Sequence, residues 1–174
     1  VELEKVFDFT FCECETIRGC CEYFVRVTPL EIDVAGIDSD IVIDNARMVV
    51  IGQSPGDTCN SKRHDGKNGY MDCLSKDITT KKVVLKCGEG NRSRTFRSSN
   101  ESPFQLAEVT IDTRYLCKPL VNIEFSSIVS FDRLAIGGDA RLRYELFRIC
   151  DNKSPVSLGV WVMERVDNEA IQRK

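Results

Sequence analysis

Cysteines are the residues of this sequence that could do chemistry, and nine of its 174 residues are cysteine. So high a share is unusual in a reducing cytosol and typical of proteins that mature in an oxidising compartment. Because nine is an odd number, at least one thiol must stay free, bind something or pair with another molecule. The nine are Cys12, Cys14, Cys20, Cys21, Cys59, Cys73, Cys87, Cys117 and Cys150.

Four of the cysteines crowd into the pattern C-x-C-x5-C-C near the N-terminus. On an extended chain Cys12 and Cys14 face one side, whereas Cys20 and Cys21 face opposite sides. Adjacent cysteines rarely bond each other, since a trans peptide does not supply the separation that a disulfide needs. Intermolecular disulfides are the favoured interpretation, and internal bridges are the first alternative. A thiolate metal site ranks last, because no paired C-x2-C occurs and His64 is far away.

Cys59 and Cys73 flank a polar loop rich in turn-forming residues. A disulfide between them would close a short loop and stabilise the fold by about 3 kcal/mol. His64 and Tyr70 lie in this loop. We interpret His64 as an exposed loop residue, and Tyr70 as the one aromatic residue placed to stack on a sugar.

Motifs of catalysis are missing from the sequence. It lacks G-x-S-x-G, H-E-x-x-H and G-x-x-x-x-G-K-[ST], and a single histidine leaves little room for Cys-His chemistry. We therefore expect no enzyme, with no catalytic residue, cofactor or metal ion. The net charge of −3 does not favour a nucleic-acid partner, and the basic stretch 92–97 is interpreted as one solvated face of a strand.

Alternating apolar and polar residues predict strands along most of the chain. Such segments cover 30–34, 41–51, 83–86, 104–112, 121–125, 141–150 and 156–163. A change of parity predicts a β-bulge near Ala107, and Gly137-Gly138-Asp139 predicts a hairpin before 141–150. Trp161 lies in an apolar strand and is expected in the core, while the tail after Arg165 reads as helical or frayed.

Short strands separated by turns are typical of an antiparallel β-sandwich, and we predict a jelly-roll-like all-β fold. No run of about 18 apolar residues occurs, so no insertion into a membrane is expected. The domain prediction has four parts: a cysteine-rich N-terminal connector or arm (1–22), a strand-rich segment with the polar loop (23–82), a β-sandwich (83–166) and a tail (167–174). Segment 23–82 is either a second small sandwich or extra strands of the first.

Three stretches resemble a cysteine-containing family of unknown function found in clostridial spore-formers. They are VVLKCGEG (83–90), FQLAEVTIDTRYLCKPLVNIEFSS (104–127) and YELFRICDN with LGVWVMER (144–165). The resemblance implies that Cys87, Cys117 and Cys150 are family positions. Family members often have a second cysteine after LC-x-P, where this chain has Leu120.

The overall plan is similar, more distantly, to the subunits of endospore appendage fibres. These are jelly-roll proteins whose N-terminal connector locks covalently onto neighbouring subunits. That similarity implies that Cys12, Cys14, Cys20 and Cys21 donate intermolecular disulfides, with Cys87, Cys117 or Cys150 as acceptors or in internal bonds.

We therefore expect a self-assembling structural subunit of an extracellular or spore-surface fibre or coat, whose partners are copies of itself. The alternative is a secreted β-sandwich that binds a carbohydrate or a receptor and carries only internal disulfides. Exposed aromatic residues would mark that alternative.

Overall fold

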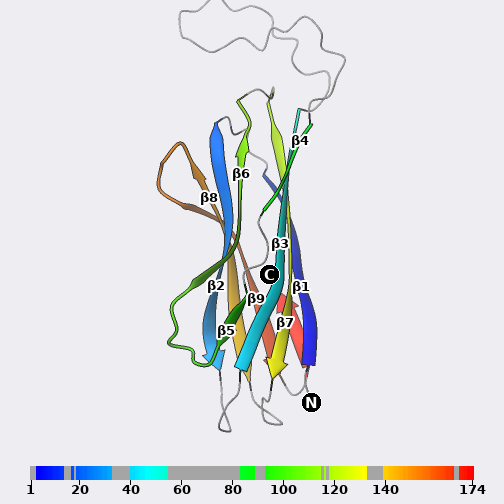
Figure 1. Cartoon of the computed structure of the whole chain (residues 1–174), viewed down its shortest axis with the longest axis vertical. Coiled ribbons are helices and arrows are strands. Elements are labelled where there is room, and N and C mark those ends of the chain that lie inside the picture. Colours follow the sequence, from blue (N-terminus) through cyan, green and yellow to red (C-terminus); the bar gives the residue numbers. More distant parts are fainter. Residues whose placement is uncertain are drawn as a thin grey trace, which may run out of the picture.

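A computed structural model describes most of the chain as two packed antiparallel sheets (Figure 1). The described residues are 3–13, 17, 19–32, 40–54, 83–88, 93–114, 116, 118–132, 139–166 and 169–174. The strands are β1 (Leu3–Glu13), β2 (Cys20–Ile32), β3 (Asp40–Gln53), β4 (Val83–Cys87), β5 (Arg94–Phe96), β6 (Phe104–Asp112), β7 (Leu120–Asp132), β8 (Ala140–Cys150), β9 (Val156–Val166) and β10 (Glu169–Arg173). The predicted all-β sandwich is confirmed.

The first sheet has the order β1-β7-β3-β4. β4 pairs with the second half of β3, and β5 pairs with the first half of β3 along the same edge. The second sheet has the order β10-β9-β8-β2-β6. Strands from the segments 23–82 and 83–166 alternate within both sheets, because β3 pairs with β7 and β2 pairs with β6 and β8. Segment 23–82 therefore supplies strands to the same sandwich as segment 83–166.

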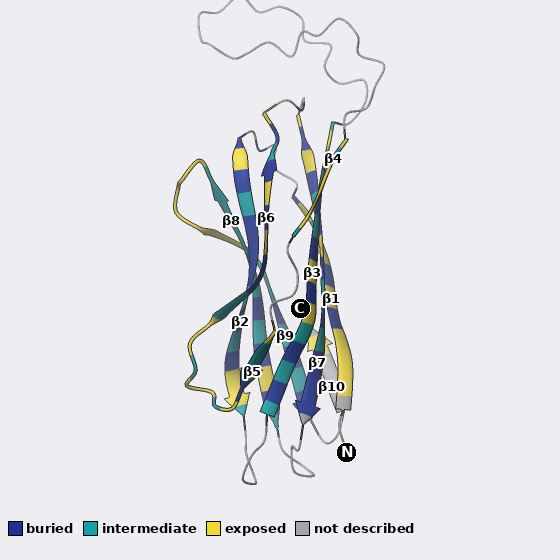
Figure 2. Ribbon diagram, in the orientation of Figure 1, coloured by how far each residue is buried: buried dark blue, intermediate teal, exposed yellow. Residues whose placement is uncertain are grey.

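Aromatic side chains join the two sheets across the core. Phe7 of β1 stacks on Tyr144 of β8 with ring centroids 3.8 Å apart, and Phe9 stacks on Trp161 of β9 at 3.9 Å. Trp161 is 4 % exposed, so its predicted place in the core is confirmed. Figure 2 shows buried residues alternating with exposed ones along these strands, as expected for a sandwich in which one face of each sheet is exposed to solvent.

The N-terminal segment differs from the expected extended arm. Residues Leu3–Glu13 form β1 and pair with β7 along their whole length. The reason lies in the alternation of Phe7 and Phe9 with Asp8 and Thr10, since the phenyl rings are buried while the polar side chains are exposed. The aromatic burial holds this segment in the sheet.

Three local predictions have different outcomes. The register between β2 and β6 shifts opposite Leu106 and Ala107, which confirms the predicted bulge. The predicted hairpin at 137–139 is wrong, because β7 belongs to the first sheet and β8 to the second. The predicted helical or frayed tail is also wrong, since Glu169–Arg173 forms β10 and pairs with β9. Among the described residues, no helix is long and apolar enough to cross a membrane.

Candidate functional site

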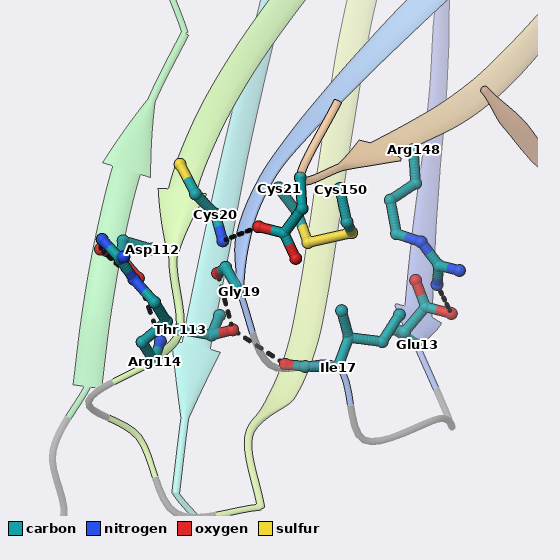
Figure 3. Close-up of a disulfide and its surroundings, with 11 residues drawn as sticks. Glu13, Ile17, Gly19, Cys20, Cys21, Asp112, Thr113, Arg114, Arg148 and Cys150 are labelled. Carbon is teal, nitrogen blue, oxygen red and sulfur yellow. Dashed lines mark hydrogen bonds and ion pairs between the residues drawn. A yellow bond between two sulfur atoms is a disulfide. The ribbon is translucent and has the colours of Figure 1, made fainter. Parts of the chain in front are cut away.

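The described cysteines gather toward one end of the sandwich, where β2 begins and β1, β6 and β8 end (Figures 1 and 3). Cys20 and Cys21 open β2, Cys150 closes β8, and Cys12 lies one residue before the end of β1. Cys87 closes β4, on the other edge of the first sheet. Cys14, Cys59, Cys73 and Cys117 lie outside the described residues, and so does the predicted bond between Cys59 and Cys73.

A tight turn between β8 and β9 sets the position of Cys150. Asp151 and Asn152 both have positive φ, at 48° and 58°, and the N–H of Lys153 donates to the carbonyl of Cys150 at 3.0 Å. Two left-handed residues in succession make a type I′ turn, which Asp and Asn tolerate. The pair Asp151-Asn152 after RIC was the sequence signal for the β8–β9 hairpin, and it was missed.

The same turn holds the start of β2. The N–H of Asp151 donates to the carbonyl of Cys20 at 3.1 Å, and the N–H of Cys20 donates to the Asp151 carboxylate at 3.4 Å. Gly19 has a φ of 141°, and a Cβ there would lie 2.8 Å from the same carboxylate. Only glycine suits this position, because the backbone is left-handed and the space is filled.

Thr113, after β6, fixes Gly19 from the other side. Its N–H donates to the Gly19 carbonyl at 2.9 Å, and its hydroxyl donates to the Ile17 carbonyl at 2.8 Å. Figure 3 shows Thr113 and Ile17 joined by this bond next to Gly19. Hydrogen bonds from β6 and from the β8–β9 turn therefore orient the two consecutive cysteines.

Cys21 and Cys150 form a disulfide within the chain (Figure 3). They are direct cross-strand partners on β2 and β8, their Cα atoms are 4.1 Å apart, and 129 residues separate them in sequence. Cys21 is fully buried. The sequence predicted an intermolecular disulfide for Cys21, whereas in the structure Cys21 forms a disulfide within the chain. Cys150 was predicted either to accept an intermolecular disulfide or to form an internal one, and the structure shows the internal bond.

Cys20 faces the opposite way from Cys21 and is exposed, without a disulfide in the structure. It lies directly opposite Asp112 of β6. Asp112 and Arg114 form an exposed ion pair at 2.6 Å, and the hydrogen bonds from Arg114 lower the pKa of Asp112 to about 2. The carboxylate of the residue opposite Cys20 is therefore already paired with a guanidinium group.

A largely buried ion pair lies to one side of the disulfide (Figure 3). Glu13 and Arg148 are 2.9 Å apart, and their side chains are only 6 % and 14 % exposed. Burial raises the pKa of nearby Tyr23 well above its usual range, and repulsion from the Glu13 carboxylate raises it further. The hydroxyl of Tyr23 and one oxygen of Glu13 have no hydrogen-bond partner among the described residues. The cluster lies mostly below the surface, and only Arg148 is partly exposed.

Cys87 is exposed on the edge strand β4 and also has no disulfide in the structure. It is the cross-strand partner of Val49, which lies between the core residues Met48 and Val50 and so faces outward. Cys87 therefore lies on the outer face of the first sheet, whereas Cys20 lies on the outer face of the second. Cys12, on β1, is exposed as well.

Within the described ranges, no three His, Cys, Asp or Glu residues come together in a way that could hold a metal ion. Two arginines of the basic stretch form ion pairs within the chain: Arg94 pairs with Glu101 at 2.9 Å and Arg97 pairs with Asp40 at 3.0 Å. Tyr70, the proposed sugar-stacking residue, lies outside the described residues.

Comparison with known proteins adds one match. Residues 81–169 match a family described as a domain of unknown function, DUF4489. This range includes the three stretches on which the resemblance to a family of unknown function rests. No curated protein and no solved structure matches the sequence.

Proposed function

The chain belongs to the DUF4489 family, and we propose that it is a self-assembling structural subunit whose copies are joined by intermolecular disulfides. One observation carries the proposal: two exposed thiols, Cys20 and Cys87, lie on the outer faces of opposite sheets, while the buried Cys21 is engaged internally with Cys150. Thiols that face away from each other on one molecule are placed to meet thiols of two different neighbours.

Opposite placement favours an open polymer over a closed dimer. A bond from Cys20 of one copy to Cys87 of the next is head-to-tail, and such heterologous contacts continue into a filament unless their rotation closes a ring. The covalent step joins two thiols by a disulfide, and dioxygen takes up their two protons and two electrons to form hydrogen peroxide. An internal disulfide in the same chain fits the oxidising compartment that this step needs.

The proposal extends to the location of the assembly. We propose that it forms an extracellular or spore-surface fibre or coat, and that the chain comes from a clostridial spore-former. Support comes from the resemblance of the stretches in 83–165 to a clostridial family and from the more distant similarity to endospore appendage subunits. A covalently joined sandwich would resist heat, detergent and proteases, as a surface layer requires.

A denaturing gel of oxidised protein, run with and without reductant, tests the proposal. Wild-type protein should give a ladder of bands that collapses to the 19.7 kDa chain on reduction. The double variant Cys20→Ser and Cys87→Ser should lose the ladder. Thr110→Ala is the matched control, because Thr110 is exposed on the same face as Cys20 and carries no thiol; its ladder should equal that of the wild type.

Two results would count against this account. A wild-type monomer in both lanes would refute assembly through disulfides. A ladder that persists in the double variant would keep the assembly but remove the roles of Cys20 and Cys87, and would point to other cysteines.

A further inference from the structure

Among the described residues, the first sheet ends in β1 on one side and in β4 and β5, which share the free side of β3, on the other. An edge strand presents peptide N–H and C=O groups that another strand can pair with. Hydrogen bonds at both edges show which peptide groups point outward. These directions define how the edge strands of two copies could pair.

At the β1 edge, the side chain of Gln172 on β10 shows which peptide groups point outward. The N–H of Asp8 donates to the Gln172 side-chain oxygen at 3.4 Å, and the Asp8 carbonyl accepts from the Gln172 amide nitrogen. Peptide groups alternate in direction along an antiparallel strand, so those of Thr10 point outward too. The side chain of Thr10 is exposed, on the outer face of the sheet.

At the β4 edge, the N–H of Gly88 donates to the carbonyl of Met48 at 2.8 Å, so the peptide groups of Met48 point toward β4. By alternation those of Val50 do the same, and Val50 is the direct partner of Lys86. Lys86 is therefore hydrogen-bonded to β3, and the peptide groups of Leu85 point to the open edge. The side chain of Leu85 is 57 % exposed.

The two edges match each other. β1 is antiparallel to β7, β7 to β3 and β3 to β4, so β1 and β4 run in opposite directions. On both edges, the residues whose peptide groups point outward carry exposed side chains. The pairs Cys87–Val49, Val49–Glu124 and Glu124–Thr10 place the end of β4 level with Thr10 across the sheet.

We propose, building on the proposed self-assembly, that β4 of one copy adds to β1 of the next, so that the first sheet continues from copy to copy. Because Cys20 and Cys87 then lie on opposite faces of the row of copies, a disulfide between them would join copies of two different rows. A sideways translation brings the two strands together as an antiparallel pair, with the outer-face side chains on the same side. Main-chain hydrogen bonds would supply affinity, as in other cases of strand addition. The partner is a second copy of this chain.

Protection of the other edge positions supports this choice. Gln172 occupies the peptide groups of Asp8, in the middle of β1, and leaves Thr10 one outward position further along. Gly88, directly after β4, packs tightly against the backbone of β6, since a Cβ on it would lie 2.6 Å from the Glu108 carbonyl oxygen. β4 instead exposes apolar side chains on its outer face, at Leu85 and at Val83, which is 53 % exposed.

Proline substitutions at the two edges test the pairing. Leu85→Pro and Thr10→Pro each remove an outward N–H and leave the bonds to the inner strand in place. Sedimentation under reductant isolates docking from disulfides. Wild-type protein should form concentration-dependent oligomers, and each variant alone should sediment as a monomer. An equimolar mixture of the two variants should form dimers and nothing larger, because one intact β4 edge then meets one intact β1 edge.

Controls separate docking from folding. Leu85→Lys keeps the N–H and places a charge on the edge, so it should also block docking if the proline variant fails to fold. Val156→Lys is the matched control, because Val156 is 47 % exposed on the other sheet, and it should assemble like the wild type. Dimers formed by Thr10→Pro alone, or wild-type assembly by Leu85→Lys, would overturn the proposed pairing. A wild-type monomer under reductant that still polymerises on oxidation would refute the docking and uphold the disulfide assembly.

Discussion

Two tyrosine hydroxyls are buried in the sandwich, and both resist ionisation. Tyr144 is fully buried and its hydroxyl lies 3.5 Å from that of Ser127. Burial raises the pKa of Tyr144 and of Tyr23 well above the usual range, and the Glu13 carboxylate adds to the rise at Tyr23. A phenolate in either place would be a charge with little solvation.

Alkaline titration should therefore unfold the protein before these tyrosines ionise. Because their folded pKa values lie above the unfolded value of about 10, their contribution to stability is complete below that pH and is lost as the pH rises above it. Absorbance at 295 nm should show the phenolates of Tyr23 and Tyr144 only as the far-ultraviolet circular dichroism is lost. The variants Tyr23→Phe and Tyr144→Phe identify each signal. Ionisation of either residue near pH 10 in a folded sandwich would contradict the burial.

Residue patterns predicted part of the cysteine chemistry. Alternation along an extended chain correctly put Cys20 and Cys21 on opposite faces. It could not say which of them faces the core, because that depends on the register of β2 against β8. The partner of Cys21 lies 129 residues away, and no local pattern encodes that distance.

At the scale of elements, the alternation of side chains predicted most strands but not their assignment to sheets. The hairpin expected at Gly137 failed because the chain crosses between sheets there, a choice made by packing and not by the turn residues. Residues 3–13 read as a connector because the nearby cysteines suggested an arm, although Phe7 and Phe9 already had the spacing of a half-buried strand.

The disulfide joins two neighbouring strands, β2 and β8, and should stabilise the whole sandwich. Replacing Cys21 and Cys150 together by alanine should lower the free energy of unfolding by about 2–5 kcal/mol, because a cross-link between distant residues restricts the unfolded chain. Urea unfolding followed by tryptophan fluorescence measures the change. Cys87→Ser, on an exposed edge, should shift the stability by less than about 0.5 kcal/mol. Equal midpoints for the wild type and the double alanine variant would contradict a stabilising role.

At the scale of the whole molecule, the chain is a sandwich with thiols on both outer faces and unlike edges on one sheet. The family-matched segment contains the six strands β4 to β9, whereas β1, β2 and β3 come before it and β10 extends beyond it. Since β2 and β3 each lie between strands of that segment, the earlier residues complete its sheets. The sequence left open whether segment 23–82 formed a second small sandwich or extra strands of the first, because sheet order depends on pairing between distant strands.

Isotope mixing shows whether the disulfides join different molecules or lie within one. Reduced chains labelled with nitrogen-15 and unlabelled chains would be mixed in equal amounts, oxidised, digested and analysed by mass spectrometry. We expect disulfide-linked peptides of Cys20 and Cys87 that combine one labelled and one unlabelled chain, while the Cys21–Cys150 pair always comes from a single chain. Linked peptides that never mix the two labels would show that the disulfides are internal and would contradict the account.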